Sequence, residues 1–147
     1  MKELRLLQVV PSLESGGVEQ GTIDLANYIG NAGYKSIVAS SRGRMLSYLN
    51  FKKVEHLKLS VHSKNPLIIY SNIRKLKKII FDNKINLIHV RSRAPSWSAR
   101  YASSNLCKSV STFHNVYGHN NLFKRYYNKS LAKVIKTFKS FRDIYFI

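Results

Sequence analysis

The chain has 147 residues, 44% of them hydrophobic, which is enough for one domain with a buried core. Its single cysteine, Cys107, excludes an internal disulfide and a cysteine-based metal cluster. We interpret Cys107 as a buried or unreactive thiol rather than a nucleophile. The formal net charge of +18 favours polyanionic partners, although a lysine-rich composition spread over solvated faces explains it equally well. No membrane-spanning run or signal-peptide pattern is present, which predicts a cytoplasmic protein.

The chain opens on an apolar run from Leu4 to Val10, which predicts a strand that is buried on both faces. A helix follows, and Asn31 and Gly33 give its stop signals. Short strands at 35–41 and 55–59 are predicted next, with a helix at 44–52 between them. The apolar face of the first helix consists of Val18, Thr22, Leu25 and Ile29.

Asn65-Pro66 predicts the start of a long helix, because Asn caps helices well and Pro fits the first helical position. Strands at 86–90 and 109–113 then alternate with helices at 95–106 and 120–133. This alternation predicts an α/β, Rossmann-like parallel sheet with helices on both faces. The apolar side of the long helix consists of Ile69, Tyr70, Ile73, Leu76 and Ile80.

Glycines and polar side chains follow four of these strands. Ligands bind beyond the carboxyl ends of parallel strands, so this set predicts a site for a phosphorylated, hydroxyl-rich ligand. The Gly-Gly pair lets a backbone approach a phosphate at a helix N-terminus, although most such pairs are plain turns. The residues are Gly16, Gly17, Arg42, Gly43, Arg91, Ser92, Arg93, His114, Asn115, Tyr117 and Gly118.

His114 is the strongest candidate for a catalytic role, because a neutral imidazole donates or accepts a hydrogen bond near neutral pH. A structural role for it stays equally open. His89, inside its strand, is better explained as a hydrogen-bonded core residue. The histidines show neither metal-ligand spacing nor a second ligand type nearby, so no metal site is predicted. With only seven acidic residues, a pair of catalytic carboxylates is also difficult to build.

Three segments together resemble the N-terminal domain of retaining glycosyltransferases with the GT-B fold, of the family 4-like type. Two shorter segments, His62–Pro66 and Ser92–Pro95, are most similar to the lipopolysaccharide core transferases of that family. The three segments are Leu7–Pro11 with Ser15–Glu19, Asn86–Ser98 and Thr112–Gly118.

This resemblance implies a two-domain enzyme whose N-terminal half holds a cell-envelope acceptor and whose C-terminal half binds a nucleotide-sugar. It implies that His114 is catalytic and contacts the transferred sugar, while Gly16 and Gly17 approach the diphosphate or the acceptor. Arg91 and Arg93 would line the acceptor side, with no metal and no cofactor besides the donor substrate. The further substrate-binding positions are Ser92, Asn115, Tyr117 and Gly118.

The chain departs from the family at its end. Residues 1–133 resemble the N-terminal domain, whereas 134–147 resemble a truncated or atypical tail, so we expect the C-terminal donor-binding domain to be absent. A domain that supplies one side of the cleft is expected to be inactive alone, unless a separate C-terminal transferase chain completes it.

Two other readings of the basic charge stay open. A patch at Lys124–Tyr127 combines cations with aromatic rings and fits a polyanion- or RNA-binding module, although it offers no specific nucleic-acid motif. A cluster at Arg74–Lys78 is expected to hold the protein peripherally on the anionic inner face of the cytoplasmic membrane. A non-catalytic subunit that only binds acceptor is a third possibility.

Overall fold

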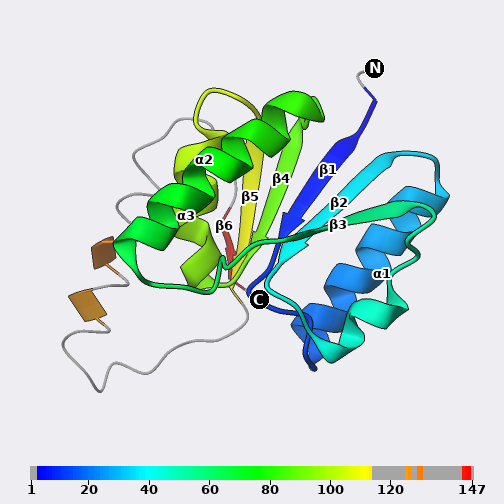
Figure 1. Ribbon diagram of the computed structural model, residues 1–147, viewed down its shortest axis with the longest axis horizontal. Coiled ribbons are helices and arrows are strands. Elements are labelled where there is room, and N and C mark those ends of the chain that lie inside the picture. Colours follow the sequence, from blue (N-terminus) through cyan, green and yellow to red (C-terminus); the bar gives the residue numbers. More distant parts are fainter. Residues whose placement is uncertain (1–2, 114–124, 127–128, 131–143, 147) are drawn as a thin grey trace.

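The strands of the described chain form one parallel sheet in the order β3-β2-β1-β4-β5-β6 (Figure 1). The computed structural model describes residues 3–113, 125–126, 129–130 and 144–146. The strand order is that of a Rossmann fold, so the predicted fold class is confirmed. The strands are β1 (Arg5–Val9), β2 (Lys35–Ser40), β3 (Val54–Lys58), β4 (Leu87–Arg91), β5 (Lys108–Phe113) and β6 (Ile144–Phe146).

Helices cover both faces of this sheet. Helix α1 (Gly17–Asn31) and the short 3₁₀ helix η1 (Arg44–Tyr48) lie on one face, and α2 (Pro66–Asp82) and α3 (Arg93–Ser103) pack together on the other (Figure 1). The chain changes faces between β3 and α2. It therefore winds outward in both directions from the β1–β4 pair, which is the topological switch point where such sheets open a crevice.

Strand β1 lies at the centre of the hydrophobic core. Residues Leu6–Val9 are all buried, and Leu7 pairs with Ile37 of β2 on one side and Ile88 of β4 on the other. Burial on both faces explains why the sequence here is a continuous apolar run rather than an alternating one. One buried cluster lies between the sheet and the α2–α3 layer, and a second lies beneath α1.

Buried polar side chains fix α1 onto the sheet. The Gln8 side-chain amide donates a hydrogen bond to the carbonyl of Thr22 at 2.9 Å, and the Ser36 hydroxyl donates to the carbonyl of Ala26 at 3.0 Å. These bonds use carbonyl groups in the middle of α1, so they fix the position of the helix along β1 and β2.

Helix α2 begins as the sequence predicts. The Asn65 side chain accepts a hydrogen bond from the Leu67 N–H at 2.9 Å, and Pro66 occupies the first helical position. Tyr70, however, is 63% exposed, so its assignment to the apolar side is wrong. It lies six residues from Leu76, which is about 120° around the helix, beyond the narrow stripe that meets the sheet.

The predicted helix at 44–52 is also wrong, because the structure has only the five-residue η1 there. None of its residues is buried, and Leu49 that follows is the buried residue of the turn. Its apolar side chains, Met45 and Leu46, are only partly buried against the cluster beneath α1. This is too little burial to stabilise a longer helix, so η1 ends at Tyr48 and the chain turns through Asn50 toward β3.

Helix α3 ends at Ser103, three residues before the predicted end. Asn105 adopts a left-handed conformation with φ of +63°, and the N–H groups of Leu106 and Cys107 both donate to the Ser103 carbonyl. The helix predicted at 120–133 falls mostly outside the described residues. In the segment 134–147, Ile144–Phe146 form β6, which pairs with Ser111–Phe113.

His56 of the β3 edge strand is half-buried, and its Nε2 lies 2.8 Å from the hydroxyl of the fully buried Ser40. Burial lowers the pKa of His56 below its ordinary value of 6.5. Below that pH the unfolded chain takes up a proton that the folded chain resists, so this histidine makes stability fall as the pH decreases.

Replacing His56 should therefore flatten the acid side of the stability profile. We expect the free energy of unfolding of His56→Gln, measured by urea titration, to decline less between pH 7 and pH 5 than that of the parent chain. The exposed His62 provides the matched control, and His62→Gln should keep the parental slope. Parallel profiles for the parent and His56→Gln would contradict the assignment.

Candidate active site at the carboxyl edge of the sheet

Three loops of the described chain meet at the carboxyl edge, after β1, β2 and β4. The predicted residues Gly16 and Gly17 lie in the first loop and at the start of α1, and Arg42 and Gly43 lie in the second. The residues at 91–93 join β4 to α3. The parallel sheet thus brings these predicted positions to one edge.

The loops after β1 and β2 are joined by backbone hydrogen bonds. The Leu13 N–H donates to the Arg42 carbonyl at 2.9 Å, and the Leu13 carbonyl accepts from the Met45 N–H at 2.8 Å. A Cβ on Gly43 would overlap the backbone carbonyl of Leu13, so glycine is required here by close packing. Gly43 is therefore explained by the fold and needs no ligand.

Gly16 and Gly17 differ in whether the fold requires glycine at that position. Gly16 caps α1 with φ of +123°, a conformation that other residues rarely adopt, so the turn itself requires glycine. Gly17 is the first residue of α1, and a Cβ built there would have no atom within 4 Å among the described residues. Nothing in the described fold requires glycine at 17, and the open space beside it leaves room for a ligand.

Arg91 ends β4 at the switch point and turns toward α1. Its guanidinium donates to the Gly21 carbonyl at 3.4 Å, and its Nε is buried with no hydrogen-bond partner among the described residues. Burial lowers the pKa of Arg91 from its ordinary value, because desolvation disfavours the cation. A partly desolvated guanidinium at this edge interacts more strongly with an anionic ligand than an exposed one does.

Gly21 is the residue that sequence reasoning missed here. A Cβ at this position would lie 3.5 Å from an Arg91 Nη atom, so the glycine leaves the guanidinium room against the helix. The only signal for it is a glycine inside a helical pattern, which the sequence cannot connect to a residue 70 positions away.

Ser92 has a strained backbone, with φ of +82° at the N-cap of α3. Its N–H donates to the Thr112 carbonyl at 3.2 Å, and its carbonyl accepts from the Ser96 hydroxyl at 2.8 Å. Strain of this kind is maintained by surrounding contacts and is frequent at binding sites. Arg93, the first residue of α3, is half-buried beside it.

His89 is half-buried and its Nε2 lies 3.2 Å from the Thr112 hydroxyl, so it is hydrogen-bonded as expected. It precedes Arg91 by two residues on β4, and both side chains therefore point to the α1 side of the sheet. Because side chains alternate along a strand, the sequence predicts that His89 and Arg91 share one face once the strand is known.

The remaining predicted residues are placed only in part. His114, Asn115, Tyr117 and Gly118 lie outside the described residues. Of the basic aromatic patch at 124–127, the structure describes Arg125 and Tyr126, which are both exposed. Over the described ranges, no group of three or more metal-ligating side chains gathers, and no helix has the length and apolarity to cross a bilayer.

Cys107, in the turn before β5, is half-buried against the core. Burial raises the pKa of its thiol to about 11, because a thiolate is poorly solvated there. The thiol is therefore protonated near neutral pH, which agrees with its interpretation as an idle group.

Comparison with known proteins identifies the family. The model of "Glycosyltransferase Family 4" matches residues 15–141, which include the glycine pair, the β4–α3 loop and β5. The chain belongs to glycosyltransferase family 4. The Rossmann-like sheet described above is the fold that the chain shares with a solved glycosyltransferase.

One solved structure supports this assignment, and two others share the fold. A glycosyltransferase from Rickettsia africae ESF-5 is 39% identical, with a TM-score of 0.74 over 90% of this chain. A putative UDP-N-acetylglucosamine 2-epimerase from Listeria monocytogenes shares the fold at 10% identity, with a TM-score of 0.60 over 91% of this chain. A second UDP-N-acetylglucosamine 2-epimerase structure is 13% identical, with a TM-score of 0.57 over 90% of this chain.

This chain spans little more than a third of the length of each of these solved structures. It covers 35% of the Rickettsia glycosyltransferase and 37% and 39% of the two epimerase structures. A comparison with curated proteins gave no match.

The two kinds of glycine at this edge are separable by mutation. Gly43→Ala should lose about 1–3 kcal/mol, because the new methyl group overlaps the Leu13 backbone, and its Tm should fall by roughly 3–10 °C. Gly17→Ala is the matched control and should be at least as stable as the parent, because its Cβ meets open space. Thermal unfolding followed by circular dichroism measures both, and equal losses would contradict the distinction.

Proposed function

We propose that this chain is the acceptor-side domain of a retaining glycosyltransferase that moves a sugar from a nucleotide-sugar to lipopolysaccharide or another cell-envelope acceptor. The observation that carries the proposal is an open Gly17 at the start of α1, with the half-buried Arg91 of β4 donating to the Gly21 carbonyl one turn further along the same helix. The membership of the chain in glycosyltransferase family 4 supports the chemistry.

Gly16 and Gly17 are assigned to the diphosphate or the acceptor. The first N–H groups of α1 have no partner within the helix and point, with the positive end of its dipole, toward the glycine turn. Gly17 leaves no side chain between these groups and a ligand. The turn can therefore bring backbone donors within hydrogen-bond distance of phosphate or hydroxyl oxygens.

Arg91, Ser92 and Arg93 are assigned to the acceptor side of the cleft. Arg91 supplies a fixed cation, and the strained Ser92 turns the chain so that Arg93 begins α3 at the same edge. His114 is assigned to the transferred sugar, and Asn115, Tyr117 and Gly118 to its surroundings, by resemblance to the family. We propose no metal and no cofactor, since basic groups and helix ends stabilise the leaving diphosphate.

The proposed active site needs binding groups on both sides of its cleft. Stabilisation of a departing nucleoside diphosphate requires preorganised donors on both sides of the cleft, and the residues above supply one. We propose that the chain does not transfer sugar by itself and that a separate C-terminal transferase chain completes the site.

The proposal includes a membrane contact through the outer face of α2. Leu67 and Phe81, at the two ends of this helix, are 79% and 77% exposed. Tyr70 and Arg74 lie between them on the same outer stripe, and Lys77 borders it. Exposed apolar and aromatic side chains around cations fit an anionic lipid surface, where an acceptor lipid would reside.

The role of Gly17 is tested on the chain recovered from its source cells with any partner it binds. The eluate should transfer sugar to lipid acceptors, whereas the purified chain should show no turnover. Gly17→Ala should lower transfer at least tenfold at unchanged Tm, because its methyl group occupies the space assigned to the ligand.

His114→Ala should abolish transfer by the same eluate. Gly33→Ala, in the turn at the opposite end of α1, should keep transfer although its φ of +86° strains an alanine and lowers the Tm. Full activity of Gly17→Ala would remove the glycine turn from the site. Turnover by the purified chain would show that one domain suffices.

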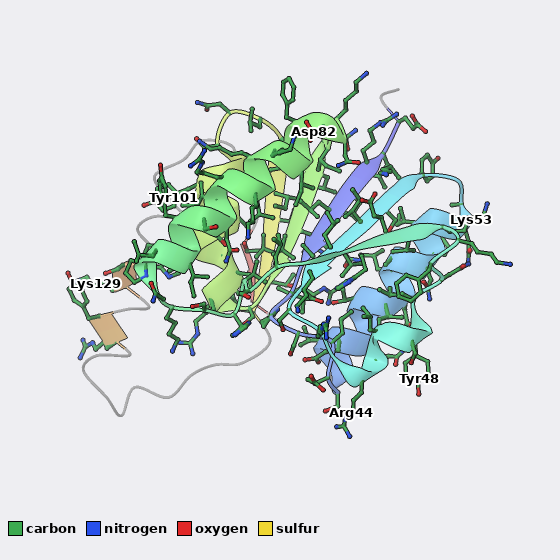
Figure 2. The ribbon with its side chains drawn as sticks, in the orientation of Figure 1. Arg44, Tyr48, Lys53, Asp82, Tyr101 and Lys129 are labelled. Atoms are coloured by element: carbon green, nitrogen blue, oxygen red, sulfur yellow. The ribbon has the colours of Figure 1, made fainter. Side chains whose placement is uncertain are left out.

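The α2 surface is tested by sedimentation with vesicles of phosphatidylcholine and phosphatidylglycerol. Each basic residue at such a surface contributes about 1 kcal/mol, so Arg74→Gln combined with Lys77→Gln should weaken binding roughly thirtyfold at low salt. Lys52→Gln with Lys53→Gln removes the same charge at the β3 side of the sheet, away from α2, and should bind almost as the parent does (Figure 2). Equal loss in both double variants would mean that net charge alone attracts the vesicles.

A further inference from the structure

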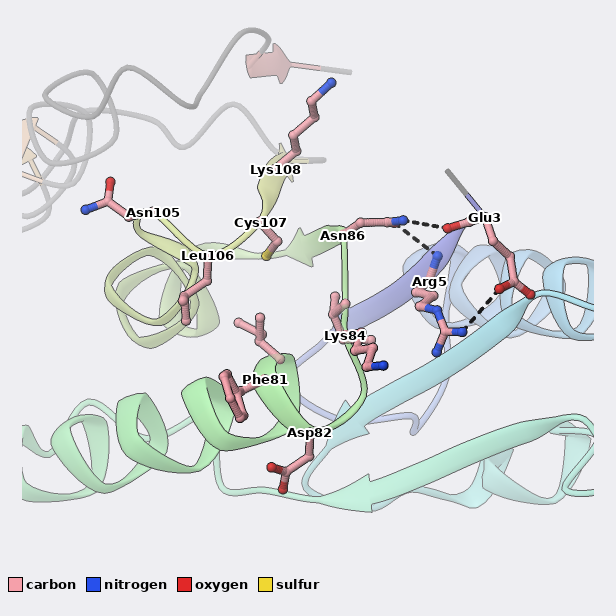
Figure 3. A pocket seen from close by; sticks show the side chains of 12 residues that line it. Glu3, Arg5, Phe81, Asp82, Lys84, Asn86, Asn105, Leu106, Cys107 and Lys108 are labelled. Atoms are coloured by element: carbon pink, nitrogen blue, oxygen red, sulfur yellow. Dashed lines mark hydrogen bonds and ion pairs between the residues drawn. The ribbon is translucent and has the colours of Figure 1, made fainter. Parts of the chain in front are cut away.

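A hollow lies at the amino edge of the sheet, opposite the candidate active site. It is open to the surface and has a volume of about 1020 Å³, within the upper range of small-molecule sites. Its walls come from the start of β1, the end of α2 with the turn into β4, and the turn between α3 and β5 (Figure 3). Of the residues that line it, the proposed function uses only Phe81, at the end of the α2 surface, and none that is assigned to the sugar-transfer cleft.

One end of the hollow is apolar and the other is cationic. Phe81, Leu106 and Cys107 border the apolar end, and Arg5 and Lys84 border the other (Figure 3). Phe81 and Leu106 are both exposed although they are large hydrophobic residues, so the hollow offers apolar surface to whatever enters it.

The charges at the cationic end are unequally compensated. Glu3 pairs with Arg5 at 3.1 Å, and Asp82 pairs with Lys78 at 2.9 Å, so both carboxylates that line the hollow are engaged. Lys84 has no ion pair among the described residues. An anion that enters this end therefore meets an ammonium group without displacing a carboxylate.

The backbone of Lys84 also distinguishes this end. Lys84 follows α2 in the left-handed conformation, with φ of +51°, and the next N–H, of Ile85, donates back to the Ile80 carbonyl at 2.9 Å. Glycine is the residue that usually occupies this position after a helix, because it adopts a positive φ without strain. A lysine here adds strain to the turn and places a cation at the hollow.

We propose that this hollow binds a single-chain anionic amphiphile, with its carboxylate or phosphate head on Lys84 and its alkyl chain between Phe81 and Leu106. Charge complementarity selects the head group, and the exposed apolar walls select the chain. A purely polar anion would leave those walls in water, and a cationic amphiphile would place its head against Lys84. The site would let an acyl-chain ligand occupy the domain without entering the sugar-transfer cleft.

Cys107 reports on occupancy, because it borders the apolar end and is the sole cysteine of the chain. The rate of maleimide labelling is measured at pH 8.5 with dodecyl phosphate below its critical micelle concentration. We expect saturable protection of at least fivefold. Inorganic phosphate and dodecyltrimethylammonium at the same concentrations should not protect the thiol.

Lys84→Gly is the decisive variant, because it removes the cation while relieving the positive φ. It should keep or raise the Tm and weaken dodecyl phosphate binding at least tenfold. Asn105→Gly is the matched control: Asn105 also lines the hollow at a positive φ, of +63°, but carries no charge, so this variant should bind as the parent does.

Four outcomes would overturn the proposal. Equal protection by the cationic amphiphile, or parental binding by Lys84→Gly, would show that no anion site exists. Protection by phosphatidic acid vesicles without protection by monomeric dodecyl phosphate would assign the hollow to a bilayer lipid. Protection that grows with protein concentration alone, together with a dimer in sedimentation, would assign it to a second copy of the chain.

Discussion

The parallel pairing of β1 with both β2 and β4 is the constraint on which the rest of the structure depends. A parallel neighbour on each side requires crossover connections, and their handedness places α1, before β2, on one face and α2, before β4, on the other. The same pairing directs the carboxyl ends of all three strands to one edge. The glycine turn and Arg91 consequently meet there although 74 positions separate Gly17 from Arg91 in the sequence.

Three glycines at this edge show how a requirement of the fold differs from room for a ligand. Gly43 is required because its loop lies directly against the Leu13 backbone, and Gly16 because the cap of α1 has a positive φ. Gly17 satisfies neither requirement, since its α-carbon faces open space among the described residues. A glycine that the fold leaves unexplained is stronger support for ligand approach than a glycine motif by itself.

The sequence predicted most of the fold because its strongest signals are local. The apolar run of β1 and the Asn65-Pro66 cap each act within a few residues and were confirmed in place. The predicted helix at 44–52 and the inward Tyr70 were wrong, because burial there depends on what packs against the segment. For the site, strand ends predicted which residues gather at the edge. Contacts such as that of Arg91 with Gly21 depend on helix placement, which no local pattern encodes.

The glycine content of α1 makes the stability of this helix depend on its packing against the sheet. Besides Gly17 at its start, the helix carries Gly21 and Gly30 in its interior, which together weaken it by about 1–2 kcal/mol relative to alanine. Gly30 nevertheless fits closely, since a Cβ there would lie 2.8 Å from the Lys53 carbonyl. Such a helix depends for its stability on packing against β2 and β3, since a short helix is marginal by itself in water. The glycine turn at its N-terminus depends on the same packing, so a substitution that weakens the contact of α1 with the sheet also affects the ligand-binding edge.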